Sequence, residues 1–412
     1  MKKWLAICLI FALLLGTLTG CGGSGELGAP EETPEPTPVE TEAPVETESP
    51  EEGEEIDYMA LYQEALDTVL DTWKTHDTDT AVFTVNGAPV TWGEFYYFLN
   101  GELQNYLYYL GTLPEDFNVV FSGETTLAQY FMDSVLFSCK YYSIAHQKAQ
   151  EMNVTVSEES EESIQSSWEQ LLEEYGGEDA LAEAMADSCL EKETFLSLLR
   201  GNEELVAVME ALYGAGGEEM TEEEVLNWAA EQGYIRVKHI LYINFDDTGV
   251  TLDEDALAEQ KVRAEATLAE LQALAGDSDA LEARFDEIMN ADSGDGGGLI
   301  NFPEGYTFTE GTMYPVFEEA AFALEDYGLS ELVESQSGYH IILRLPLDTE
   351  GLTMDRDANT GAYMTLRQTA ANELFQRELL DWIQTAEVEW TPGFEDLDLN
   401  ELFGIVPPEA EE

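Results

Sequence analysis

Basic residues are scarce in this chain, and their scarcity limits the partners that it can have. Among 412 residues, 16 are Lys or Arg and 86 are Asp or Glu, which gives a formal net charge of -70. Because such a surface repels phosphate groups, neither nucleic acid nor an anionic membrane face is a natural partner. The charge favours a soluble protein with a solvated acidic surface, or one that meets basic clients or divalent cations.

Cysteine is also scarce, and only Cys139 and Cys189 lie beyond position 21. These two could form a disulfide or stay as buried free thiols, because the sequence does not show whether they are close. The ligand spacings HExxH and CxxC are absent, so we predict no metal and no other cofactor. Ser337-Gly338 does not lie in a strand-to-helix elbow, and Gly296-Gly-Gly298 lacks the Lys of a phosphate loop, so neither a serine hydrolase nor a nucleotide site is favoured.

No apolar run is long enough to cross a bilayer, including the first one. Two lysines precede an apolar stretch from Trp4 to Leu18, which runs on into Thr-Gly-Cys21. A basic start, a short apolar run and small residues before a break form the secretory signal pattern. The ending resembles the bacterial lipobox, in which the Cys becomes the lipidated first residue of the mature protein. We therefore expect a lipoprotein signal peptide over residues 1–20 and a lipid on Cys21 that holds the protein at the extracytoplasmic face of the cell membrane.

The segment from residue 21 to residue 56 lacks Lys and Arg and is rich in Gly, Ser, Pro, Glu and Thr. Its prolines break any helix, and its glutamates repel one another. We expect a disordered acidic tether that holds the folded part away from the membrane.

Helical periodicity dominates from residue 57 to residue 232. One strand is predicted at Ala81–Val85, and the turn Asn86-Gly87 folds it into a hairpin. A capping box at Thr91-Trp-Gly-Glu94 starts a helix that should bury Phe95, Leu99, Leu103, Tyr106 and Leu110. Other helices are expected near 58–73, 125–151, 157–175, 178–187, 191–213 and 221–232.

Residues 234–347 have a different pattern, in which strands and helices alternate in the order β-α-α-β-α-β-β. The strongest strands are Tyr234–Ile243 and Gly338–Arg344, and Thr251–Glu254 reads as a capping box for the first helix between them. This order predicts an α+β domain with its own core. Because helical sequence returns over 362–384, the α+β domain is expected to be inserted in one mainly helical body.

Two of the four histidines, His239 and His340, lie in the two strongest strands of this domain. If the first and last strands are neighbours in the sheet, the two imidazoles can meet. A strand histidine can also be a core residue with a satisfied partner, so the pattern alone leaves both interpretations open.

Three separated motifs resemble the signature stretches of parvulin isomerases, in the same order and spacing. They are Val237-Lys-His-Ile-Leu241, Phe317-Glu-Glu-Ala-Ala-Phe-Ala-Leu324 and Ser337-Gly-Tyr-His-Ile-Ile342. The flanking segments near 85–97 and 363–386 resemble the chaperone body of SurA/PrsA-type foldases. The resemblance implies a parvulin-like antiparallel sheet with surrounding helices, inserted in a mainly α-helical body. The resulting division is a helical chaperone part over 57–232, a parvulin-like domain over 234–347, a returning helix over 350–390 and an acidic tail over 391–412.

The resemblance also implies roles for single residues. It assigns the catalytic positions to His239, Asp295, Ser337 and His340, and the apolar pocket for the proline ring to Met313 and Phe317. The loop over 292–298 is shorter and richer in glycine than the family pattern, so Asp292 is an alternative to Asp295. The helical stripe that contains Phe317 fits plain core packing as well as a pocket.

The predicted function is peptidyl-prolyl cis-trans isomerisation and chaperone action on unfolded or partly folded exported polypeptides that contain X-Pro bonds. The mechanism that the resemblance implies is non-covalent, because Asp295 stands where a nucleophilic Cys would be required. The alternative is a non-enzymatic holdase whose parvulin-like domain is inactive. A solute-binding protein would need two lobes of repeated strand-helix units, which the pattern lacks. Whether the chain is a monomer or a homodimer is left open.

Overall fold

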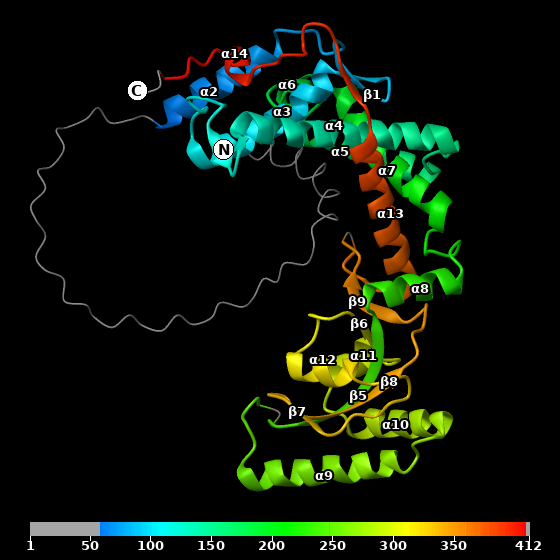
Figure 1. Cartoon of the computed structure of the whole chain (residues 1–412). Helices are drawn as coiled ribbons and strands as arrows, with labels where there is room; N and C mark the ends of the chain where they lie inside the picture. The colour runs from blue at the N-terminus through cyan, green and yellow to red at the C-terminus, as the bar shows by residue number, and fades with distance from the viewer. Residues whose placement is uncertain (1–57, 247, 359, 409–412) are drawn as a thin grey trace, which may run out of the picture. The chain divides into compact units, whose positions relative to one another are not determined.

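The computed structural model describes residues 58–246, 248–358 and 360–408, which form two compact units (Figure 1). The first unit contains the described residues up to Val208 together with those from Leu379 onward. The second unit is the intervening stretch, Met209–Glu378. The predicted signal peptide, tether and lipidated Cys21 lie outside the described residues. Among the described residues, no helix has the length and apolar character needed to cross a bilayer.

The first unit is mainly helical, with one small sheet and one separate hairpin. The sheet has the order β11-β1-β2, and β3 pairs with β4 in the hairpin. Its helices are α2 (Tyr58–Trp73), α3 (Trp92–Leu110), α4 (Leu127–Met152), α5 (Glu158–Tyr175), α6 (Glu178–Ala186), α7 (Lys192–Tyr213, which runs into the second unit) and α14 (Leu399–Leu402). Its strands are β1 (Ala81–Val85), β2 (Ala88–Thr91), β3 (Val120–Ser122), β4 (Thr125–Thr126) and β11 (Val388–Trp390).

The turn and the helix cap that the sequence predicts near the start of this unit are present in the structure. Asn86 and Gly87 have φ angles of 50° and 84°, as a tight antiparallel turn requires, and the predicted hairpin is confirmed. The capping box of Thr91 and Glu94 is also present. One predicted core position is wrong: Leu110, the last residue of α3, is 59% exposed, and Leu107, one turn earlier, is buried instead.

Residues far apart in the chain close the core of the first unit. Strand β11 pairs with β1, which places Trp390 opposite Phe83. The buried Trp92 and Tyr96 donate hydrogen bonds to the carbonyls of Trp73 (2.8 Å) and Val69 (2.6 Å), and so fix α3 to α2. In the tail, Phe394, Leu399 and Phe403 are buried. Phe394 and Phe403 contact the rings of His76 and Tyr96, so residues 394–403 are part of the same core as α2, β1 and α3.

Cys139 and Cys189, whose pairing the sequence left open, are free thiols in buried surroundings. Burial raises the pKa of both thiols, so neither is a thiolate at neutral pH.

The second unit is an α+β domain built on a six-stranded sheet of order β10-β9-β6-β5-β8-β7. Strands β6 and β9 pair in parallel, and the other neighbours are antiparallel. The strands are β5 (Ile235–Ile243), β6 (Tyr306–Phe308), β7 (Val333–Glu334), β8 (Gly338–Leu345), β9 (Leu352–Arg356) and β10 (Tyr363–Thr365). The helices are α8 (Glu222–Gln232), α9 (Glu254–Gln272), α10 (Ser278–Asp292), α11 (Gly296–Asn301), α12 (Pro315–Phe322) and α13 (Leu366–Thr385, which runs into the first unit). The predicted fold class, an α+β domain inserted in a mainly helical chain, is confirmed.

The two faces of the central strands carry different clusters, because successive side chains of a strand point to opposite sides. On one face, Ile240 and Tyr242 of β5 and Ile341 and Leu343 of β8 pack against α9 and α10. On the other face, Val237 and neighbouring apolar residues pack against α12. Figure 1 shows α12 on the opposite side of these strands from α9 and α10.

Two details of this unit differ from the expectation. Asp253, not Thr251, caps α9, and Thr251 pairs instead with Phe245 in an isolated bridge. The chain after Leu347 does not return directly to helix: β9 and β10 come first, and α13 begins at Leu366. These strands are short and partly polar, so their pattern gave no strand signal; their pairing depends on the edge that β6 presents.

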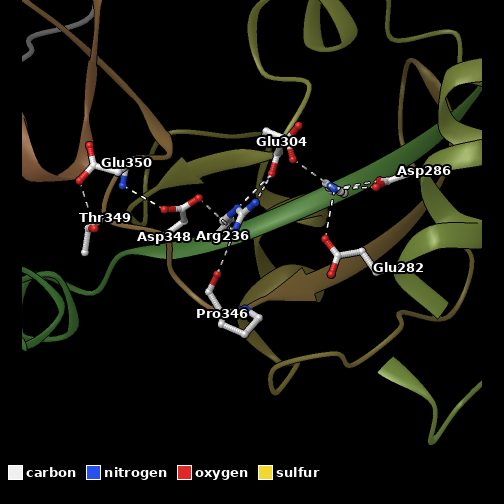
Figure 2. A network of polar contacts seen from close by, with 9 residues as sticks. Arg236, Glu282, Asp286, Glu304, Pro346, Asp348, Thr349 and Glu350 are labelled. Carbon is white, nitrogen blue, oxygen red and sulfur yellow. Dashed lines mark hydrogen bonds and ion pairs between the residues drawn. The ribbon is translucent and has the colours of Figure 1, made fainter. Parts of the chain in front are cut away.

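A network of charged and polar side chains lies beside β5 (Figure 2). The buried Lys238 ammonium forms ion pairs with Asp286 (2.8 Å) and Glu282 (3.3 Å) of α10. The Arg236 guanidinium donates to the Glu304 carbonyl at 2.8 and 3.0 Å. The network thus fastens α10 and the loop before β6 to the strand that carries His239.

We predict that Glu282→Gln with Asp286→Asn destabilises the protein by about 2–4 kcal/mol, because the buried Lys238 then keeps only the exposed Glu304 carboxylate, at 3.8 Å, as an anionic partner. Lys238→Met should cost less, since the two carboxylates it leaves are partly exposed and can be hydrated. Urea unfolding measures both free energies. Glu270→Gln, which removes an exposed ion pair with Arg284, is the matched control and should change stability by less than about 0.5 kcal/mol. Equal losses for all three variants would contradict the prediction.

Candidate active site

Two histidines distant in the sequence meet on the α12 side of the sheet. In the antiparallel pairing of β5 with β8, His239 lies opposite Ile342 and His340 lies opposite Leu241, so the histidines are diagonal neighbours. Their Nδ1 atoms are 3.1 Å apart, and the two residues are 8% and 6% exposed. The expected meeting of the two imidazoles is confirmed.

Asp295 completes one end of this pair. It caps the short helix α11, with Oδ1 accepting from the Gly298 N–H at 3.0 Å. Its Oδ2 lies 2.6 Å from His239 Nε2 and accepts from the Tyr306 hydroxyl at 2.5 Å. The alternative residue, Asp292, is exposed and faces Arg263 at 3.4 Å, so the structure brings Asp295 and not Asp292 to the histidines.

A serine hydroxyl completes the other end, but it belongs to Ser335 and not to Ser337. Ser335 Oγ lies 2.7 Å from His340 Nε2, whereas Ser337 contributes its backbone N–H to Ser335 Oγ at 3.1 Å. Val333 lies directly opposite His340, so Ser335, two residues further along, is on the same face. Ser337 lies in the turn between β7 and β8, which corrects the predicted position by two residues.

These contacts form one continuous chain of hydrogen bonds. An ionised carboxylate can only accept, so His239 Nε2 carries the proton that it shares with Asp295. His239 Nδ1 can then accept from His340 Nδ1, and His340 Nε2 can accept from the Ser335 hydroxyl. Every polar atom in the chain has a partner, which fixes the tautomer of each imidazole.

Burial and neighbouring charges set the ionisation of these groups. Burial and the adjacent His239 lower the pKa of His340 to about 4, although the Asp295 carboxylate acts in the opposite direction. Burial alone would raise the pKa of Asp295, but hydrogen bonds from His239 and Tyr306 and the nearby His239 outweigh it and lower that pKa. Burial and Asp295 raise the pKa of the Tyr306 hydroxyl. At neutral pH the site therefore contains an anionic Asp295, a neutral His340 and a protonated Tyr306.

An apolar cluster borders the imidazole pair. The Phe317 ring lies edge-on to His239 (5.2 Å between centroids) and to His340 (5.5 Å). Phe317 is 5% exposed and packs with Phe308 and Ile342, so it is a core residue that also contacts both imidazoles. Met313 is partly buried in the same cluster, and the Glu318 carboxylate accepts from its backbone N–H at 2.7 Å.

Sequence reasoning missed two polar residues of the site, Tyr306 and Ser335. Tyr306 begins the short strand β6, and it lies opposite Val237, two residues before His239. Gly298 shows how closely it is packed: a Cβ at this position would lie 2.1 Å from the Tyr306 hydroxyl. No signal in the sequence marked Ser335, whose position depends on how tightly the chain turns before β8.

Comparisons with known proteins find similar sequences among peptidyl-prolyl isomerases and foldases. A family model described as Rotamase, PPIC-type PPIASE domain, matches residues 239–345. The chain is 30% identical over 224 residues to foldase protein PrsA of Oceanobacillus iheyensis, covering 54% of this chain and 59% of that protein. It is 29% identical over 248 residues to foldase protein PrsA 2 of Listeria innocua, covering 59% of this chain and 72% of that protein.

Among solved structures, peptidylprolyl isomerase PrsA of Bacillus anthracis has 21% sequence identity and a TM-score of 0.21, covering 59% of this chain and 94% of that chain. The matched part of the chain spans less than two thirds of the length of the Oceanobacillus iheyensis protein. Residues 239–345 thus match a PPIC-type peptidyl-prolyl isomerase domain, and the resemblance of the chain to PrsA-type parvulin foldases is confirmed.

Proposed function

We propose that this protein is a peptidyl-prolyl cis-trans isomerase and chaperone for exported polypeptides. The observation that carries the proposal is the pair of buried imidazoles, held between Asp295 and Ser335 and bordered by Phe317, within the matched domain. An apolar surface beside a preorganised polar chain is the combination that this reaction requires.

The reaction is a rotation about the X-Pro amide bond. Its barrier is about 20 kcal/mol and arises from amide resonance, which is lost when the bond twists. No bond to a heavy atom has to form or break, so the protein needs neither a nucleophile nor a metal. It needs contacts that are stronger with the twisted amide than with the planar one.

Each residue of the site has one role in this reaction. Phe317 and Met313 offer an apolar surface for the proline ring, and the buried imidazoles offer fixed dipoles beside it. Asp295 holds the His239 ring and its tautomer, while Ser335 does the same for His340. Because the site is buried and its polar groups are already oriented, little reorganisation is needed when the amide twists. Asp295 acts as an acceptor that positions His239 and does not attack the substrate.

The proposal also covers where the protein lies in the cell and what the segments outside the isomerase-like domain do. A signal peptide over 1–20, a lipid on Cys21 and a tether over 21–56 would place the folded part at the extracytoplasmic face of the cell membrane. The partners there are unfolded or partly folded polypeptides that contain X-Pro bonds. The helical segments over 57–232 and 350–390 serve as the chaperone body, and 391–412 as its acidic tail.

The first test uses the chain from residue 22 onward in a protease-coupled assay with a prolyl tetrapeptide. The wild-type protein should accelerate isomerisation, and His239→Ala and His340→Ala should each lower kcat/KM by about tenfold or more, since each removes oriented dipoles from the site. Circular dichroism confirms that the variants are folded. A folded wild-type protein without turnover would instead support the holdase alternative.

A matched serine pair tests the corrected assignment. Ser335→Ala should lower kcat by about three- to tenfold, since His340 Nε2 loses its donor and the ring its fixed orientation. Ser337→Ala keeps the backbone N–H that this residue contributes and should stay within about twofold of the wild type. The same assay gives kcat and KM for both variants. A larger loss for Ser337→Ala would return the role to Ser337.

Acid should weaken this domain through His340. Its pKa is about 4 in the folded state and about 6.5 in an unfolded chain, so the unfolded state binds the proton first as the pH falls. The free energy of unfolding is therefore unaffected by the ionisation of His340 above pH 6.5. It falls as the pH falls from 6.5 toward 4, by an amount on the order of 3 kcal/mol. Urea unfolding of the wild type and of His340→Gln over this range measures the difference. Parallel pH dependences for the two proteins would contradict the shift.

A further inference from the structure

Exposed apolar side chains gather in one part of the first unit. Of the eighteen large apolar residues that are exposed in the described part of the chain, eight lie within thirty consecutive positions. Together they are called the aromatic surface: Tyr108, Tyr109, Leu110, Val119, Val120, Phe121, Tyr130 and Phe137. Their exposed fractions run from 41% at Phe137 to 77% at Tyr109. Isolated exposed apolar residues are ordinary, but a cluster of this size marks an interaction site.

The aromatic surface is built from three elements that pack together. It contains the last turn of α3, the β3–β4 hairpin and the exposed side of α4, and both α3 and the hairpin contact α4. The Phe121 ring of the hairpin lies 4.8 Å from the Tyr130 ring of α4. Beneath them, Tyr106 of α3 packs edge-on against the buried Phe131 of α4. The exposed rings therefore stand on a packed support and do not belong to a loose loop.

The hairpin also offers backbone groups. Strand β3 pairs with β4 in a two-stranded sheet, and no third strand joins it among the residues that the structure describes. All three residues of β3 are exposed. An open strand edge with apolar side chains is the template to which an extended polypeptide can add.

The stretch of chain that forms the aromatic surface is acidic, and its first basic neighbour along α4 is Lys140, one turn after Phe137. No Lys or Arg occurs between Lys74 and Lys140, a stretch that includes the whole surface. Glu124 at the hairpin is exposed, and so is Asp133, which lies between Tyr130 and Phe137 along α4. An apolar surface with an acidic surround favours a partner that combines apolar and basic residues, and it repels an anionic membrane.

We propose that the aromatic surface binds an extended, unfolded polypeptide segment that carries apolar side chains next to Lys or Arg. The segment adds along the open edge of β3, its apolar side chains contact the exposed rings, and its basic residues lie near the surrounding carboxylates. The proposal rests on the chaperone part of the proposed function and specifies which segments of a client are held. It requires no proline, so it is separate from the imidazole site.

The test measures binding of a fluorescent peptide to the chain from residue 22 onward, by anisotropy. The peptide has about twelve residues, alternates Phe, Leu and Val with Ser, contains no proline and has two Lys at each end. Tyr109→Ser with Phe121→Ser should weaken binding by about tenfold or more, since both are exposed rings of the surface, one from α3 and one from the hairpin. Val206→Ser, which removes an exposed apolar side chain of α7 in the same unit, is the matched control and should change nothing.

A second peptide with Glu in place of Lys separates charge from apolar contact. It should bind about tenfold more weakly than the Lys peptide at low salt, and added salt should reduce that difference. The prolyl tetrapeptide assay on the Tyr109 and Phe121 variant should match the wild type, so a failed isomerase proposal and a failed binding proposal give different results. The proposal is overturned if the wild type does not bind the Lys peptide, if Val206→Ser has the same effect, or if sedimentation shows that the aromatic surface joins two copies of the chain.

Discussion

The pairing of β5 with β8 is the constraint on which the site depends. It brings His239 and His340, which are 101 positions apart in the chain, to adjacent places on one face of a sheet. Side chains of a strand alternate, so a shift of the register by one residue would send one imidazole into the cluster with α9 and α10. The apolar residues on both faces of these strands therefore protect the geometry of the site as well as the stability of the domain.

The elements around this strand pair hold charged and polar groups in fixed positions. Lys238 points to the face opposite that of its neighbour His239, and its ion pair with Asp286 holds α10 against β5. Arg236 donates to the Glu304 carbonyl and so holds the loop that precedes Tyr306 (Figure 2). Tyr306 in turn holds the Asp295 carboxylate against His239. A buried carboxylate is costly unless it is fully hydrogen-bonded, so these contacts are what allow an anion to stay beside the imidazole pair.

The first unit is formed by two separate segments of the chain, one that ends at Val208 and one that begins at Leu379. These two segments have to be joined in one core. They are joined by β11, whose pairing with β1 and packing of Trp390 against Phe83 complete the core. That core is dense in aromatic residues, and the eight exposed members of the aromatic surface extend this composition to the solvent. An acidic chain can carry such a surface and stay soluble because its net charge opposes self-association.

The sequence by itself determined most of the helices, the two long strands and the face on which His239 lies, because periodicity and capping depend on near neighbours. Three ordered motifs also indicated the resemblance to parvulin isomerases, which a family model matches over residues 239–345. Only the tertiary structure decided that Ser335 and not Ser337 contacts His340, that Tyr306 supports Asp295, and that β9 and β10 extend the sheet. These features depend on how a turn closes and which strand edge is available, and both are set by residues distant in the chain.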